Sequence, residues 1–164
     1  MDFKQGEEMK QKILKPKIRI TPIGFGTAID HITPGMGLRI VEVIKVEKDN
    51  AISIAINTES KKLGRKDLIL FENKFLNEKE LDKVKLLARN ATHNVIKDFK
   101  IVEKERLGLP ERVSEIIECI NPTCITNHEM IPTKFIITKK KPLQAKCYYC
   151  ETVMEEEEIM RAVK

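Results

Sequence analysis

Apolar and polar residues follow two periods in the first hundred residues, and these periods predict the secondary structure. Strict alternation and short apolar runs bounded by turn residues indicate strands. Apolar residues three and four positions apart, after a capping residue, indicate helices. The strands predicted in this way are residues 18–20, 27–32, 51–57 and 67–71, followed by a short hairpin of residues 92–96 and 99–102.

Two helices are predicted between these strands. Thr33 and Pro34 supply a capping hydroxyl and a proline at the first helical position, and apolar residues of 36–44 then fall on one face. The isoleucine and valine content of 36–44 leaves a strand open as the alternative. The second helix begins at Asn77, where Glu80 completes a capping box. Its buried stripe consists of Leu81, Val84 and Leu87.

The order of elements from residue 18 to 105 is strand, helix, strand, strand, helix, strand, with the last strand split. This is the ferredoxin-like βαββαβ order. An all-parallel sheet is excluded because the link from residue 57 to 67 is too short for a crossover. The fold class predicted is therefore α+β, with an N-terminal ferredoxin-like domain and a small C-terminal β domain.

A boundary between two domains is predicted at Gly108-Leu-Pro110. Residues 1–17 are rich in charge and are expected to form a flexible N-terminal arm. The first domain is then 18–107 and the second is 111–164. Within the second domain, strands are predicted at 113–119 and 131–138, and a terminal helix near Glu155.

All four cysteines lie in the second domain, as two close pairs. Cys119 and Cys124 enclose four residues, and Cys147 and Cys150 enclose two. Two such knuckles can aim four thiolates at one tetrahedral ion and leave no open coordination position, so the pattern predicts one structural zinc. Two disulfides are the alternative, and a chain without a secretory signal argues against them.

Composition limits the classes of function. The chain of 164 residues carries 30 basic and 25 acidic residues, and the two signs are interspersed, so it is not a nucleic-acid-binding tail. The first nine residues are charged where a signal peptide needs an apolar run, and no apolar stretch reaches membrane-spanning length. We therefore expect a soluble, cytoplasmic protein. A charged fraction of 34% favours an ion-paired surface of the kind found in heat-adapted proteins.

Few residues outside the cysteines are candidates for chemistry. Asp30-His31 could act in acid–base catalysis, but no nucleophile motif accompanies the pair, so local hydrogen bonding or ligand binding is the better interpretation. Gly24 and Gly26 lack the rest of a dinucleotide fingerprint. Basic residues at 61–66 and 139–141 are interpreted as solvated turns. Residues alone thus predict a two-part binding protein without catalytic machinery.

Several stretches together resemble the regulatory chain of aspartate carbamoyltransferase. The resemblance runs from about residue 18 to the last cysteine. It rests on Gly26-Thr-Ala-Ile-Asp-His-Ile32, Gly64-Arg-Lys-Asp-Leu-Ile69, Phe71-Glu-Asn73, Ala91-Thr-His-Asn94, Leu109-Pro-Glu-Arg112 and the cysteine frame with Asn121-Pro-Thr-Cys-Ile125.

This resemblance implies a non-catalytic subunit of an enzyme of pyrimidine biosynthesis. It implies that 18–107 is a nucleotide-binding allosteric domain for CTP, ATP and possibly UTP, and that 111–164 contacts the catalytic chain. It also implies a regulatory-chain homodimer, paired through the sheet, and a dodecamer of two catalytic trimers and three regulatory dimers. The alternatives are a zinc-ribbon nucleic-acid-binding protein and a free-standing nucleotide sensor.

The resemblance also implies site residues. The nucleotide-binding positions are Ile23, Asp30, His31, Lys66, Asn94, Ile101 and Lys104, and the metal ligands are Cys119, Cys124, Cys147 and Cys150. Departures from the family pattern fall at Leu70, where a lysine is frequent, at Phe99, where a tyrosine is frequent, and at residues 21–25. Asn121, Glu129, Tyr149 and Glu151 match positions that contact the catalytic chain, and Thr123 replaces an asparagine.

Overall fold

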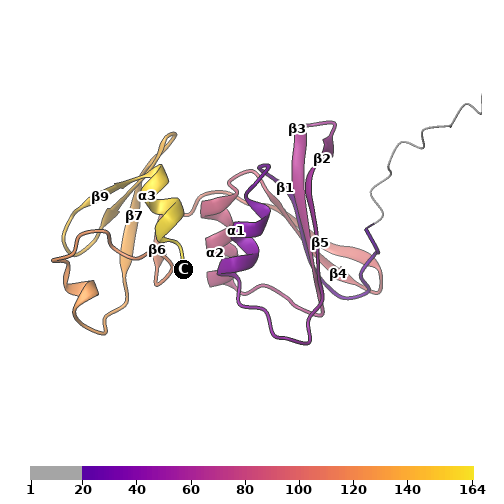
Figure 1. The fold of residues 1–164 in the computed structure, drawn as a ribbon, viewed down its shortest axis with the longest axis horizontal. Helices are drawn as coiled ribbons and strands as arrows, with labels where there is room; N and C mark the ends of the chain where they lie inside the picture. The colour runs from indigo at the N-terminus through magenta and orange to yellow at the C-terminus, as the bar shows by residue number, and fades with distance from the viewer. Residues whose placement is uncertain (1–19) are drawn as a thin grey trace, which may run out of the picture.

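A computed structural model describes residues 20–164, which form two antiparallel sheets and three α-helices (Figure 1). The predicted arm at 1–17 and nearly all of the strand predicted at 18–20 lie outside the described residues. Ile20 itself is not in a strand. Within residues 20–164 no helix is long and apolar enough to cross a membrane.

The first sheet has five strands in the order β2-β3-β1-β4-β5. Their bounds are Gly26–Ile32 (β1), Ile52–Ser60 (β2), Gly64–Glu72 (β3), Thr92–Lys97 (β4) and Lys100–Arg106 (β5). The first four strands, with helix α1 (Gly37–Val43) after β1 and helix α2 (Glu78–Leu87) after β3, have the predicted βαββαβ order. The predicted hairpin supplies β4 and an additional edge strand, β5. The predicted fold class is therefore confirmed for this part of the chain.

Helices α1 and α2 cover one face of this sheet and leave the other face open (Figure 1). Ile40 and Val43 of α1 and Val84 of α2 are buried with Ile29 and Ile69 of the central strands. The helical interpretation of 36–44 is thus confirmed over the strand alternative. Alternate residues of β1, such as Ala28 and Asp30, point to the open face, because side chains alternate along a strand.

The start of α1 differs from the prediction at Thr33. The helix begins at Gly37, and no side chain of its own segment caps it. Instead, the carboxylate of Asp67, fully buried in β3, accepts hydrogen bonds from the backbone N–H of Gly35 (2.8 Å) and of Gly37 (3.0 Å). Asp67 therefore provides the cap from a strand 30 residues further along the chain.

The start of α2 agrees with the prediction. Asn77 accepts from the backbone N–H of Glu80 (2.9 Å), and the Glu80 carboxylate accepts from the Asn77 N–H (3.0 Å). This reciprocal pair is a capping box, in which both partners lie three residues apart. The helix start is thus determined locally.

The second sheet has four short strands in the order β6-β7-β8-β9. The elements of this part are β6 (Arg112–Ser114), the 3-10 turn η1 (Ile125–Asn127), β7 (Lys134–Lys140), β8 (Leu143–Cys147), β9 (Val153–Glu155) and α3 (Glu156–Ala162). A small β domain with a terminal helix is confirmed. The basic run at 139–141 was interpreted as a turn, but only Lys141 lies in the turn to β8; Lys139 and Lys140 are exposed residues at the end of β7.

Two strand predictions in this part need correction, and two strands were missed. The strand predicted at 113–119 ends at Ser114, because Glu115 takes a left-handed conformation (φ 62°), and Ile117 pairs separately with Val163. The strand predicted at 131–138 begins only at Lys134, after Pro132, which has no N–H to donate. Strands β8 and β9 were not predicted, although Leu143, Ala145 and Cys147 alternate with half-buried residues.

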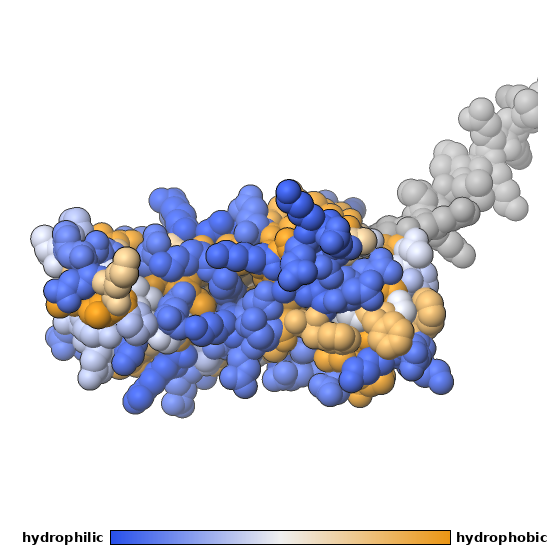
Figure 2. Space-filling view, turned by 90° about the horizontal axis from the view of Figure 1, so that it is seen from below, coloured by the Kyte–Doolittle hydropathy of each residue, from blue (hydrophilic) through white to orange (hydrophobic). Residues whose placement is uncertain are grey.

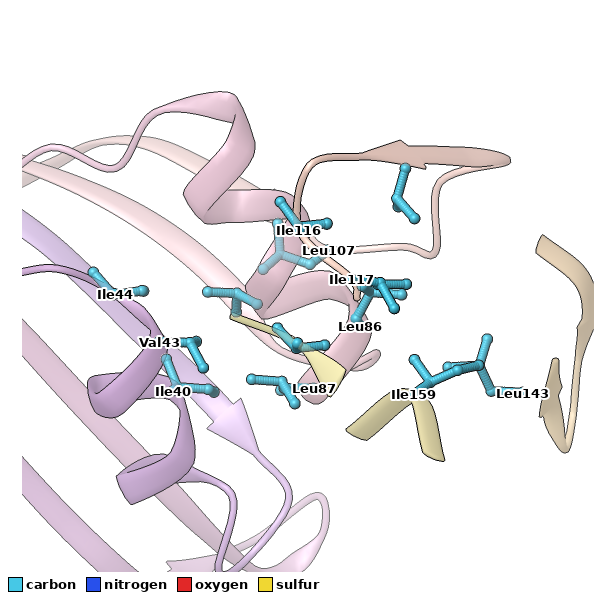
Figure 3. Packing of buried hydrophobic residues seen from close by; sticks show 14 of the residues in the cluster. Ile40, Val43, Ile44, Leu86, Leu87, Leu107, Ile116, Ile117, Leu143 and Ile159 are labelled. Atoms are coloured by element: carbon cyan, nitrogen blue, oxygen red, sulfur yellow. The ribbon is translucent and has the colours of Figure 1, made fainter. Parts of the chain in front are cut away.

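The helix layer of the first sheet lies between the two sheets (Figure 1), and the buried core continues across it. Figure 3 shows Leu86 of α2 and Leu107 beside Ile116 and Ile117, which follow β6. Polar contacts add to this packing: the Arg39 guanidinium donates to the carbonyls of Arg161 and Val163 at the end of α3. The open sheet face and the cysteine knuckles therefore lie at opposite ends of the molecule.

Candidate functional site

The four cysteines form one compact cluster. Their Sγ atoms all lie within 4.8 Å of one another, with Cys119 to Cys150 at 3.6 Å and Cys124 to Cys147 at 3.8 Å. Sulfur ligands about 2.3 Å from a tetrahedral ion lie about 3.8 Å from one another. The spacing therefore fits a closed four-thiolate metal site. Cys119, Cys124 and Cys147 are buried and Cys150 is half-buried, so the cluster is largely shielded from solvent.

Local turns hold each cysteine pair in position. In the first knuckle the Cys124 N–H donates to the Asn121 carbonyl (3.0 Å), and the Asn127 side chain donates to the carbonyls of Cys119 and Asn121. In the second, the Glu151 N–H donates to the Cys147 carbonyl (3.1 Å). Glu151 has φ 59°, the left-handed conformation that closes such a turn.

The thiols differ in acidity. Burial raises the pKa of Cys119 and of Cys147 above the ordinary value. Burial also opposes ionisation of Cys150, but hydrogen bonds with Thr152 and with the Asn121 side chain outweigh it and lower the pKa of Cys150 to about 6. A cation that replaces the protons would stabilise all four thiolates together, so metal binding releases protons from this site.

His128 does not belong to the cluster. Its Nε2 lies 2.7 Å from the Pro122 carbonyl oxygen, and the side chain is exposed. Its interpretation as a bystander is consistent with this position.

Three of the predicted nucleotide-site residues meet on the open face of the first sheet. The Lys66 Nζ lies 2.6 Å from Asp30 Oδ1, and His31 Nδ1 lies 3.4 Å from Asp30 Oδ2. A bulge between Ile29 and Ile32 places His31 in the left-handed region (φ 58°), and bulges of this kind re-aim side chains next to functional sites. Strands β1 and β3 thus bring an acid and an imidazole (Asp30 and His31 of β1) together with a cation (Lys66 of β3).

Asn94 and Lys104 extend this group across the sheet. Asn94 of β4 is opposite Ala28 of β1 and opposite Lys104 of β5 in the strand registers. The Asn94 amide donates to the Ala28 carbonyl (3.3 Å), but its buried Oδ1 has no hydrogen-bond partner among residues 20–164. A buried acceptor without a partner costs free energy, which a ligand with a suitable donor would recover.

Apolar residues complete this end of the face. Ile23 is buried with Ala28 and Leu70 in a small second cluster, and Ile96 packs against it. Ile101 is opposite Ile96 and is exposed. Figure 2 shows apolar surface gathered in the half of the molecule formed by the first sheet. Exposed apolar residues there include Phe25, Phe75, Phe99, Ile101 and Val102.

The structure gives a physical role to two of the departures from the family pattern. Leu70 is buried against Ile23, where a lysine would have to reach past the cluster to remain solvated. The Phe99 ring covers Gly24 so closely that a Cβ on this glycine would lie 3.2 Å from it. A side chain at residue 24 would therefore require the exposed Phe99 ring to move by a few tenths of an ångström.

One neighbour of the site was not singled out by sequence reasoning. Thr92 Oγ1 lies 3.5 Å from His31 Nδ1, on the face that Asn94 shares. Strand alternation was the available signal, because Thr92 and Asn94 are two residues apart. Tertiary pairing of β1 with β4 was needed to place the hydroxyl against the imidazole.

The residues around the cysteine knuckles form a second exposed surface. Asn121, which was predicted to contact a partner, holds the first knuckle, and Tyr149 donates its hydroxyl to the Pro132 carbonyl (3.2 Å). Glu129 and Glu151 are exposed. Large apolar side chains are exposed beside them: Ile120, Ile125, Met130 and Tyr148. Such a rim of apolar and polar residues is typical of a protein–protein interface.

Comparison with known proteins agrees with this two-part arrangement. Residues 18–108 match the family model described as aspartate carbamoyltransferase regulatory chain, allosteric domain, and residues 111–160 match the metal binding domain of the same chain. The aspartate carbamoyltransferase regulatory chain of Pyrococcus abyssi is 46% identical over 147 residues, which cover 88% of this chain and 97% of that protein.

Two further relatives bear the same name. The protein of Pyrococcus horikoshii is 45% identical over 148 residues (88% of this chain, 97% of the relative), and that of Methanopyrus kandleri is 39% identical over 150 residues (90% and 96%). The expectation of a regulatory chain without catalytic function is thereby confirmed. The chain belongs to the family of aspartate carbamoyltransferase regulatory chains, with an allosteric and a metal-binding domain.

Proposed function

We propose that this regulatory chain binds nucleotide effectors on the open face of the first sheet and passes their effect to the catalytic chain through its metal-binding domain. The observation that supports it best is the convergence of Asp30, His31, Lys66 and Asn94 on one face, with the Asn94 Oδ1 buried and without a hydrogen-bond partner among the described residues 20–164. CTP, ATP and UTP are the effectors expected from the family resemblance.

The chemistry of this face suits a nucleoside triphosphate. Lys66, Lys104 and an imidazole N–H of His31 are donors for phosphate oxygens, and the charge-assisted hydrogen bonds from the two lysines are strong. Asp30 orients Lys66 and accepts from sugar hydroxyls. Ile23 and Ile101 enclose the base, and their backbone groups distinguish cytosine from adenine by donor pattern.

The nucleotide claim is tested by calorimetric titration of the metal-loaded chain with CTP. Replacing Lys66 by Gln removes one charge-assisted contact, and we expect the affinity to fall about tenfold or more. The control variant is Lys62→Gln, which removes the same charge from the exposed turn between β2 and β3. Equal affinities of both variants and the parent chain would show that Lys66 does not contact the nucleotide.

We propose that the metal is one Zn²⁺, held by Cys119, Cys124, Cys147 and Cys150. Four thiolates with tetrahedral spacing suit zinc, which imposes no electronic preference on geometry, and they leave no open position for catalysis. The zinc has a structural role: it fixes the knuckles that carry the exposed apolar residues Ile120 and Ile125. We propose that this surface, with Asn121, Glu129, Tyr149 and Glu151, contacts the catalytic chain of aspartate carbamoyltransferase.

The sheet also offers a surface for pairing two regulatory chains. Its two edges are β2 and β5. Strand β5 bears a run of charges from Glu103 to Arg106, which discourage pairing along an edge, whereas β2 exposes Ile56 and few charges. We therefore propose that β2 forms the dimer edge. Three such dimers then join two catalytic trimers into a dodecamer, in the cytoplasm, where thiols stay reduced and available for zinc.

A further inference from the structure

A groove of about 1200 Å³ lies where the helix layer meets the C-terminal domain. Its walls are the start of α1, the end of α2, the turn between β7 and β8, and α3. Ligand pockets in proteins are roughly 300–1,000 Å³, so the groove can enclose a small molecule. Its apolar lining consists of Met36, Leu87, Pro142 and Met160. It is separate from the sheet-face residues and from the cysteine cluster, none of which line it.

The rim of the groove is charged, and part of this charge is matched internally. Among the lining residues are four cations and two carboxylates: Arg39, Arg89, Lys141, Arg161, Glu156 and Glu157. Arg89 pairs with Glu156, whose second oxygen accepts from the Leu143 N–H (2.9 Å). Arg161 pairs with Glu157 at 3.5 Å. Both carboxylates of the groove are therefore already engaged by its own arginines.

Two cations remain without a carboxylate partner among the groove residues. Arg39 donates to the carbonyls of Arg161 (3.2 Å) and Val163 (2.7 Å), and it pairs with Glu42 (3.1 Å), which lies outside the lining. Lys141 is exposed in the turn next to Pro142. The lining residues thus combine an apolar floor with two more cations than carboxylates. Glu42 offsets Arg39 from outside the lining, and Lys141 has no ion-pair partner among residues 20–164, so one positive charge is left to favour an anion over a neutral or cationic ligand.

We propose that this groove is a binding site for a small organic anion that has an apolar body and one acidic head group. The apolar body packs between Met36 and Met160, from helices on the two sides of the groove, and the acidic group faces Arg39 and Lys141. The groove and the proposed nucleotide-binding face share no residue.

Methionine methyl groups provide a direct readout of the site. The zinc-loaded full chain, labelled with ¹³C at the methionine methyls, is titrated with 8-anilinonaphthalene-1-sulfonate, a probe with an apolar body and one anionic group. We expect saturable shifts of Met36 and Met160, assigned with Met36→Leu and Met160→Leu. Met130, exposed near the knuckles, and Met154, buried in the second sheet, should not shift.

The role of charge is tested in the same titration. N-phenyl-1-naphthylamine has the same rings without the sulfonate and should bind more weakly. Lys141→Gln should weaken binding of the sulfonate probe about two- to fivefold, as expected for an exposed ion pair, while Lys62→Gln should leave it unchanged. Unshifted Met36 and Met160 signals, or equal affinity for the charged and uncharged probes, would overturn the proposal.

Discussion

The buried carboxylate of Asp67 joins three separate segments of the first domain. It accepts from the backbone N–H groups of Gly35 and Gly37 before and at the start of α1, and from that of Asn57 in β2 (2.8 Å). Gly37 allows this approach, because a Cβ there would lie 3.1 Å from the carboxylate oxygen. One side chain therefore caps a helix and fixes the bulge of a neighbouring strand.

Replacement of Asp67 by Asn tests this role. An amide turns an N–H₂ group toward at least one of these donors, so at least one buried hydrogen bond is lost. We expect the free energy of unfolding in urea to fall by about 1–3 kcal/mol. Asp49→Asn, in an exposed turn, is the control and should change it by less than about 0.5 kcal/mol. Equal stabilities of the two variants would contradict the capping role.

His93 should make stability depend on pH. Burial lowers the pKa of His93 below its ordinary 6.5, an effect that Glu105 and Glu103 only partly oppose, and its Nε2 has no partner among residues 20–164. The unfolded chain therefore binds this proton more readily than the folded chain. Stability should fall as the pH drops through about 6.5 toward the folded-state pKa, and remain constant with respect to this group below it.

The contribution of His93 is isolated by comparison with His93→Leu, which cannot titrate. Unfolding free energies of both proteins are measured in urea between pH 5 and pH 8. We expect the unfolding free energy of the parent chain to fall relative to that of His93→Leu as the pH is lowered from 8 to 5. Parallel curves would mean that His93 does not couple to folding.

Among the elements, helix α2 begins where two residues three positions apart, Asn77 and Glu80, cap it. The Asn77–Glu80 capping box satisfies two of the N–H groups that a helix start leaves without a partner. Asn77→Ala should therefore lower the unfolding free energy by about 1 kcal/mol. Asn77→Ser, which preserves a hydrogen-bond acceptor at this position, should retain most of the unfolding free energy that Asn77→Ala loses. An unchanged unfolding free energy of Asn77→Ala would show that tertiary packing, and not the capping box, determines where α2 begins.

The contrast between α1 and α2 explains which elements could be predicted. The start of α2 depends on residues three positions apart, so the sequence pattern located it. The start of α1 depends on Asp67, whose approach to Gly37 follows only from the pairing of β1 with β3. Short strands such as β9 contain too few residues for alternation to separate them from a loop.

The distinction between local and long-range determinants also applies to the cysteine cluster and to the sheet-face residues. Cysteine spacing within each knuckle is local, and it predicted the cluster of four. Asp30, Lys66 and Asn94 lie on three strands, and no period along the chain brings them together. Their assignment came from family resemblance, whereas the contact of Thr92 with His31 became visible only in the folded chain.

On the scale of the whole molecule, the metal should matter for assembly before it matters for nucleotide binding. The cysteine cluster lies in the second sheet domain, with the helix layer between it and the open face of the first sheet (Figure 1). Cys147→Ser should therefore abolish stoichiometric zinc binding and prevent co-purification with the catalytic chain. CTP affinity of the isolated chain should change less than about twofold. Loss of CTP binding together with zinc would show that the two domains fold as one dependent unit.

The most direct test of the proposed coupling is aspartate saturation of the assembled enzyme, measured with and without nucleotides. The chain is combined with its catalytic partner, and the aspartate concentration at half-saturation is determined in the presence of CTP, UTP or ATP. We expect at least one nucleotide to shift this concentration by about fivefold or more, as coupling of about 1–3 kcal/mol implies. The Lys66→Gln enzyme should require a higher nucleotide concentration for the same shift. Identical saturation curves with all three nucleotides would contradict a regulatory role for this face.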